Sequence, residues 1–177
     1  MTRQTHTCAI AGAICALLAL ATPARAQVPQ APPRPLPTVN MAGPRFGVTM
    51  LNQRSIDELK KHDINLKPIV SQFGWQFEKR MYANEQGLTV LSEWVPLITG
   101  LDQGVALPSL NWLAGIRTPS GHEFGVGPNI SASGVGLVMA AGVTIRSGAL
   151  NIPVNVAVAT SRFGPRFTFL TGFNIRR

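Results

Sequence analysis

The residues best suited to acid–base or metal chemistry are few in this chain. Outside the N-terminal segment the histidines are His62 and His122, which are far apart in the sequence. A zinc site needs several Cys, His or carboxylate ligands at close, regular spacings, and neither histidine belongs to such a group. We therefore expect no metal site and no cofactor.

A nucleophilic hydrolase needs a serine, a histidine and an acid that converge in space. His122 stands beside Glu123, but adjacent residues of a strand point to opposite faces. The chain contains no G-x-S-x-G motif and no phosphate-binding loop. We expect no catalytic residues. A small envelope lipid hydrolase stays open as an alternative, with His122 as its candidate.

The charged and amide side chains form a second group of candidates. Several of them alternate with apolar residues, which predicts that they share one face of a strand. If that face is enclosed, its charges must be paired, and a paired polar network is the favoured interpretation over an anion path. The expected network residues are Gln72, Gln76, Glu78, Arg80, Glu93, Arg117, Glu123, Arg146 and Arg166.

The overall charge is unusual for a water-exposed surface. Charged residues make up 14% of the 177 residues, against about 25% in globular domains. Sixteen Lys and Arg against eight Asp and Glu give +8. The basic residues are scattered without interleaved aromatics, so we expect no nucleic acid partner. Attraction to anionic lipid headgroups or lipopolysaccharide phosphates is the better electrostatic hypothesis.

The first 26 residues have the pattern of a secretory signal peptide. Arg3 is followed by an apolar run over 8–21, and Ala24-Arg25-Ala26 is a small-x-small cleavage site. The apolar run is shorter than the roughly 20 residues of a membrane-spanning helix. Cleavage after Ala26 would remove both cysteines of the chain and lower the net charge to +6, because Arg3 and Arg25 leave with the signal.

Residues 27–43 contain five prolines. Such a stretch favours extended, polyproline-like conformations, which predicts a linker ahead of a domain over 44–177.

The rest of the chain alternates with a period of two, which predicts β-strands joined by hairpin-length turns. The exception is a short helix predicted over 55–62, where Ser55 and Glu58 fit a capping box and basic residues stand at the end. Pro96, Pro108 and Pro153 each remove a ladder hydrogen bond, so we expect them near strand ends or bulges. The eight predicted strands cover 45–50, 69–82, 88–98, 105–117, 123–130, 134–146, 150–159 and 166–176.

Eight up-and-down strands avoid unpaired edges by closing into an antiparallel barrel. In a soluble barrel the apolar face points inward. In an outer-membrane barrel it points to lipid, and small and polar groups fill the lumen. The second face of the predicted strands holds mostly Gly, Asn, Gln, Thr and Ala, and no lysine follows Lys79. These features favour the outer-membrane barrel.

The aromatic residues give a further, weaker indication. They are expected near strand ends, where the aromatic girdles of membrane barrels lie. The residues in question are Trp75, Trp94, Trp112, Phe163, Phe167 and Phe173.

The signal peptide, the Cys-free mature chain, the segment EFGVGPN over 123–129 and the Phe-rich last strand resemble small bacterial outer-membrane β-barrel proteins. The resemblance covers 44–177. It implies an integral protein of the Gram-negative outer membrane with a structural or interaction role at the cell envelope, in contact with membrane lipid. The first alternative is a soluble periplasmic or secreted β-barrel that binds a lipid or another apolar ligand.

Overall fold

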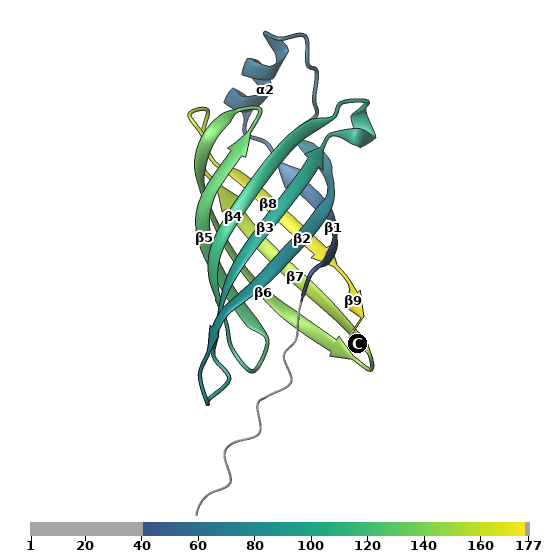
Figure 1. Ribbon diagram of the computed structural model, residues 1–177. Helices are drawn as coiled ribbons and strands as arrows, with labels where there is room; N and C mark the ends of the chain where they lie inside the picture. Colours follow the sequence, from purple (N-terminus) through teal and green to yellow (C-terminus); the bar gives the residue numbers. More distant parts are fainter. Residues whose placement is uncertain (1–40, 176–177) are drawn as a thin grey trace, which may run out of the picture. The chain divides into compact units, whose positions relative to one another are not determined.

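The computed structural model describes residues 41–175. The expected signal peptide and residues 27–40 of the expected linker lie outside the described residues. Eight strands form a closed antiparallel barrel (Figure 1). They are β1 (Gly43–Met50), β2 (Ile69–Ala83), β3 (Thr89–Thr99), β4 (Leu107–Arg117), β5 (His122–Ser131), β6 (Gly134–Ser147), β7 (Leu150–Ala159) and β8 (Arg166–Gly172).

Each strand pairs with its neighbours in the sequence, and pairing of β1 with β8 closes the barrel. The strands are strongly staggered. A row of paired residues that starts at Gln72 of β2 passes once through each of the seven other barrel strands and meets β2 again at Ala83. Such a stagger requires tilted strands, and it brings residues that are distant along the chain to the same height in the lumen.

The eight strands confirm the prediction from the period-two pattern, and their ends differ from it by a few residues. The last strand is the main exception. It ends at Gly172, and β9 (Asn174–Ile175) resumes the pairing with β7. The break lies next to Pro153 of β7, which has no N–H to donate.

The prolines are placed differently from the expectation. Pro108 is the second residue of β4, but Pro96 and Pro153 lie inside β3 and β7. The β2–β3 register omits the residues around Pro96, and the β4–β5 register omits those around Pro128. A closed barrel tolerates these residues because each interruption is short and the ladder resumes on both sides.

The predicted helix exists but begins earlier. It is α2 (Gln53–Lys60), and its N-cap is Asn52, whose Oδ1 accepts a hydrogen bond from Ser55 N (2.8 Å). The expected capping box at Ser55 is therefore wrong. Ser55 lies inside the helix and is buried, and Glu58 pairs with Lys61 instead (2.9 Å). Within the described residues, no helix is long and apolar enough to cross a membrane.

The apolar face of the strands points out of the barrel. Phe167 and Phe169 of the last strand are 54% and 43% exposed, and the outer residues of the other strands are exposed or partly exposed. The opposite face carries the buried polar side chains together with a small apolar cluster, Val95, Leu97, Leu113, Val138 and Ala159.

The aromatic residues are only partly at strand ends. Phe163 lies in the β7–β8 connection, and Phe167 and Phe173 are near the ends of β8. Trp75, in contrast, lies in the middle of β2. Trp94 and Trp112 are central in β3 and β4, where they form a cross-strand pair with ring centroids 6.0 Å apart.

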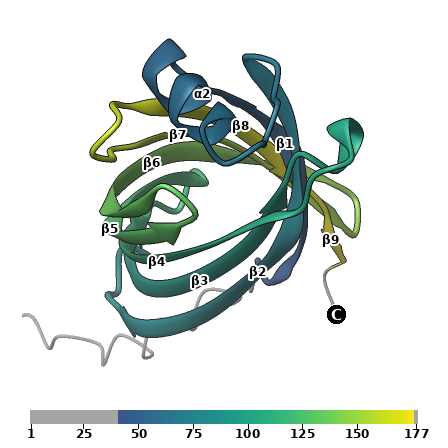
Figure 2. The ribbon, with the colours of Figure 1, turned by 90° about the horizontal axis from the view of Figure 1, so that it is seen from above.

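The two ends of the barrel have connections of different length. At the end that holds Gly43 and Ile175, which we call the terminus end, the connections are short. In the β6–β7 turn, for example, Gly148 takes a positive φ of 56°. At the other end lie the long β1–β2 connection with α2, and the β3–β4 connection with η1 (Leu101–Gln103). Seen from above, α2 lies at this mouth near β1, β7 and β8 (Figure 2).

Candidate functional site: the barrel interior

The half of the lumen nearer the termini contains a buried ion-pair cluster centred on Arg117. Its Nε donates to Glu123 Oε1 (2.5 Å), and its Nη1 donates to Glu78 Oε1 (2.8 Å). Its Nη2 bonds Glu78 Oε2 and lies 3.9 Å from Glu93 Oε1. The Arg117 and Glu78 side chains are 7% and 2% exposed. A single guanidinium thus contacts carboxylates from three strands.

Arg45 extends this cluster toward β1. Its Nε donates to Gln76 Oε1 (3.0 Å), and Gln76 Nε2 donates to Glu93 Oε1 (3.1 Å). Its Nη2 donates to the carbonyl oxygen of Met41 (2.7 Å). Arg45 is 1% exposed. Its guanidinium therefore links the start of the barrel to the ion-pair cluster, and every charge of the cluster has partners, as buried charges require.

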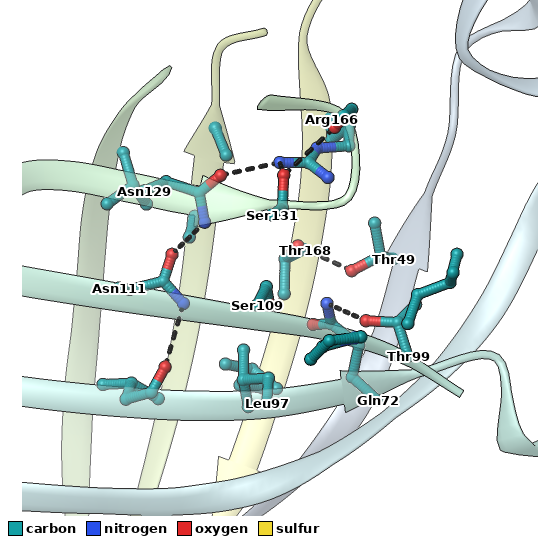
Figure 3. A pocket seen from close by; sticks show the side chains of 18 of the residues that line it. Thr49, Gln72, Leu97, Thr99, Ser109, Asn111, Asn129, Ser131, Arg166 and Thr168 are labelled. Carbon is teal, nitrogen blue, oxygen red and sulfur yellow. Dashed lines mark hydrogen bonds between the residues drawn. The ribbon is translucent and has the colours of Figure 1, made fainter. Parts of the chain in front are cut away.

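The half of the lumen nearer α2 contains neutral hydrogen bonds and one arginine (Figure 3). Arg166 Nη2 donates to Asn129 Oδ1 (2.7 Å) and to Ser131 Oγ (3.0 Å). Asn129 Nδ2 donates to Asn111 Oδ1 (2.7 Å), and Asn111 Nδ2 donates to the Val95 carbonyl (3.2 Å). This chain of bonds crosses from β8 through β5 and β4 to β3.

On the facing side of the same half, two pairs of polar side chains join neighbouring strands. Gln72 Nε2 donates to Thr99 Oγ1 (2.9 Å), and the hydroxyls of Thr49 and Thr168 are 2.7 Å apart. Figure 3 shows these pairs together with the Arg166 chain.

Between these groups lies a cavity of about 100 Å³. Its wall includes the apolar cluster of the core, and its roof includes Leu51, Leu59 and Leu66 from the β1–β2 connection. Ligand sites for small molecules are usually about 300–1,000 Å³, so the cavity is small for a lipid or a cofactor. It suits a few water molecules, each of which occupies about 30 Å³ in the liquid.

Three buried polar atoms of the cavity lining have no hydrogen-bond partner: Ser55 Oγ, Gln72 Oε1 and Asn155 Oδ1. Buried polar atoms are usually hydrogen-bonded, to protein or to ordered water. These atoms can accept bonds from water or from a small donor-bearing molecule. The other interior polar groups described above form hydrogen bonds or ion pairs that join strands. Such an arrangement is typical of a rigid, filled core.

The structure places most of the predicted network residues in the lumen, though not in one network. Gln76, Glu78, Glu93, Arg117 and Glu123 lie in the ion-pair cluster. Gln72 and Arg166 lie in the other half.

Two predicted network residues, Arg80 and Arg146, are exposed. In the strand register, Arg80 and Arg146 are opposite inward-facing residues, and both lie at the terminus end of their strands, β2 and β6. Both are exposed there, since the lumen opens to solvent, and Arg146 Nη2 donates to the Pro119 carbonyl (3.3 Å). Their part in a lumen network stays a prediction.

Sequence reasoning missed several buried polar residues. Arg45 and Thr49 alternate with Phe46 and Val48, so the signal for an inward position was present in β1. Asn111 gave no such signal, because its strand is apolar on both faces.

His62 and His122 are at opposite ends of the barrel, and both are exposed. His122 Nδ1 is 2.9 Å from Ser120 Oγ in the β4–β5 turn. Its sequence neighbour Glu123 points inward and bonds Arg117, so the carboxylate cannot orient the imidazole as a catalytic acid would. Among residues 41–175, no group of three or more His, Cys, Asp or Glu side chains is arranged to hold a metal ion.

No protein-family model, no curated protein and no solved structure matches this chain. The function must therefore be inferred from the chemistry of the barrel itself.

Proposed function

We propose that this chain is an integral outer-membrane β-barrel protein with a structural or interaction role at the cell envelope and no catalytic activity. The observation that supports this proposal most strongly is the scarcity of charged residues on the outer face of the barrel. Among the described strands, the residues that alternate to this face include a single Lys, Arg, Asp or Glu, which is Lys79. Soluble monomers rarely expose contiguous apolar patches above a few hundred Å².

Two polar side chains on this outer face are bonded within the protein, which suits a surface without water. Trp112 Nε1 donates to Ser92 Oγ (2.9 Å), and Thr171 Oγ1 donates to the Pro153 carbonyl (3.0 Å). Both bonds join neighbouring strands, so neither side chain needs a solvent partner.

The interior supports the same proposal over a soluble lipid-binding barrel. A ligand-binding barrel directs apolar side chains into a large cavity. Here the lumen holds ion pairs and amide bonds, and its cavity of about 100 Å³ is below the usual range of ligand sites. A lipid-binding role would therefore require the lumen to open.

The barrel ends suggest an orientation. Outer-membrane barrels have short periplasmic turns and longer extracellular loops. We therefore place the terminus end in the periplasm and α2 at the cell surface. Exposed basic residues near α2 could then contact lipopolysaccharide phosphates, a partner that is part of this proposal. They are Arg54, Lys60, Lys61, Lys67 and Arg162.

Cell fractionation tests the proposal. The mature chain should stay with the outer membrane after osmotic shock and after alkaline washing, and detergent should be needed to extract it. Unboiled protein should migrate differently from boiled protein on a gel. Release by osmotic shock in a form that stays soluble without detergent would instead support the lipid-binding barrel.

A further inference from the structure

The outer wall of the barrel carries a long apolar groove of about 940 Å³. The strand register explains its course. One rim is a row of paired residues that winds from β3 to β8: Val90, Ile116, Phe124, Ala141, Val156 and Phe169. The other rim is the row two positions away, from β4 to β1: Ala114, Val126, Met139, Val158, Phe167 and Met50.

The floor of the groove is backbone. The residues between the two rims point into the barrel, and all of them are small: Gly115, Gly125, Ala140, Ala157 and Thr168. On the rims, Ala114 and Ala141 are also short, which lowers the groove walls on β4 and β6. The two rims thus leave an open channel between them.

The dimensions of the groove select its occupant. The Cα atoms of the two rims are two residues apart along each strand, which is about 7 Å. A groove of this spacing is too narrow for an α-helix of about 10–12 Å diameter and suits an extended hydrocarbon chain. Six strand spacings of about 4.8 Å make the groove about 29 Å long. It runs obliquely from the terminus end of β3 to Met50, at the α2 end of β1.

The terminus end of the groove adjoins Lys79, the one cation that the described strands carry on their outer face. Lys79 pairs with Ser92, which pairs with the rim residue Ala114. Tyr82 pairs with the rim residue Val90. Both side chains are exposed, so an ammonium and a phenol group stand where the apolar channel ends.

We propose that the groove binds an anionic glycerophospholipid, with an acyl chain along the channel and the phosphate at Lys79 and Tyr82. An apolar channel that ends in a cation and a hydroxyl complements a molecule with an acyl chain and an anionic headgroup. This inference rests on the proposed membrane location. In that orientation the headgroup lies in the periplasmic leaflet.

The test uses the mature chain folded in non-ionic detergent micelles and titrated with phosphatidylglycerol or with phosphatidylcholine of the same acyl chains. Native mass spectrometry measures the lipid retained. Lys79→Gln should weaken phosphatidylglycerol binding about fivefold and leave phosphatidylcholine unchanged. Its matched control, Arg146→Gln at the terminus end of β6, should bind both lipids as the wild type does.

Ala141→Phe should reduce retention of both lipids, since the ring fills the channel. Val135→Phe, on the outer face of β6 beyond the groove, is the matched control and should have no effect. A gel shift on heating verifies that each variant is folded, and Ala114→Phe replaces Ala141→Phe if the latter does not fold.

Equal retention of the two lipids by the wild type, or unchanged retention in Ala141→Phe and Ala114→Phe, would mean annular lipid only and would overturn the inference. A protein that needs detergent but shows no headgroup preference loses this inference and keeps the proposed function. A protein that is soluble without detergent loses both.

Discussion

Glu78 of β2 and Glu93 of β3 are directly opposite each other, with both side chains inside the barrel. Like charges in this position repel. Arg117, two strands from β2, offsets the repulsion because it bonds Glu78 and approaches Glu93. The stagger of the strands makes this possible, and it makes Arg117 the residue on which the terminus half of the lumen depends.

Arg117→Met should therefore lower the free energy of unfolding by about 3–5 kcal/mol, because buried carboxylates lose their counter-charge. Urea unfolding of the folded protein in detergent measures the change. Arg146→Met, an exposed arginine of β6, is the control and should change it by no more than about 0.5 kcal/mol. Similar small effects of both substitutions would contradict the assigned role of Arg117.

The loss of stability caused by a charge on the outer face should depend on the depth of that charge in the membrane. Val156→Arg, near the middle of β7, should destabilise the protein in lipid bilayers by about 2–4 kcal/mol, whereas Val135→Arg, near the α2 end of β6, should cost about 0–1 kcal/mol. The reason is the low polarity of the bilayer centre. Equal tolerance of both arginines in vesicle unfolding assays would indicate that water covers this face.

Asn52 should control the order of α2. Its Oδ1 caps the helix, and its Nδ2 donates to the Pro165 carbonyl (2.9 Å). Asn52→Ala should destabilise the helix by about 1 kcal/mol, which corresponds to roughly fivefold faster amide exchange over 53–60. Gln53→Ala, an exposed position, is the control. Unchanged exchange in Asn52→Ala would show that packing alone holds the helix.

The β3–β4 connection should respond to acid. Hydrogen bonds from the Ser71 hydroxyl and backbone N–H lower the pKa of Asp102 below its ordinary value of 3.8. A lowered carboxyl pKa contributes stability that is complete above 3.8 and is lost as pH falls through the folded value. Ser71→Ala should raise the pKa of Asp102 in a carbon-13 titration. An unchanged titration would mean that these bonds do not hold the connection.

The period-two pattern predicts the eight strands because each strand separates an apolar outer face from a small or polar inner face. It also predicts that Phe167 and Phe169 share a face. It does not say which face is outside, since both barrel types alternate. The exposure of these two residues answers that question, because only the closed structure distinguishes inside from outside.

The site was harder to predict than the strands. The partners of Arg117 depend on strand stagger, which no local pattern encodes. Asn111 was missed because its strand lacks alternation, and the exposure of Arg80 was not predicted because alternation does not show where the lumen opens. The N-cap of α2 at Asn52, ahead of Ser55, was missed because both residue types are good N-caps.

The most direct test of the membrane proposal uses the three tryptophans, Trp75, Trp94 and Trp112, which all point outward from the middle of their strands. The folded protein is reconstituted in phosphatidylcholine vesicles whose acyl chains carry bromine near the bilayer centre. The proposal predicts strong quenching of tryptophan fluorescence relative to unbrominated vesicles. Unchanged fluorescence, with the protein recovered in the aqueous fraction, would contradict it.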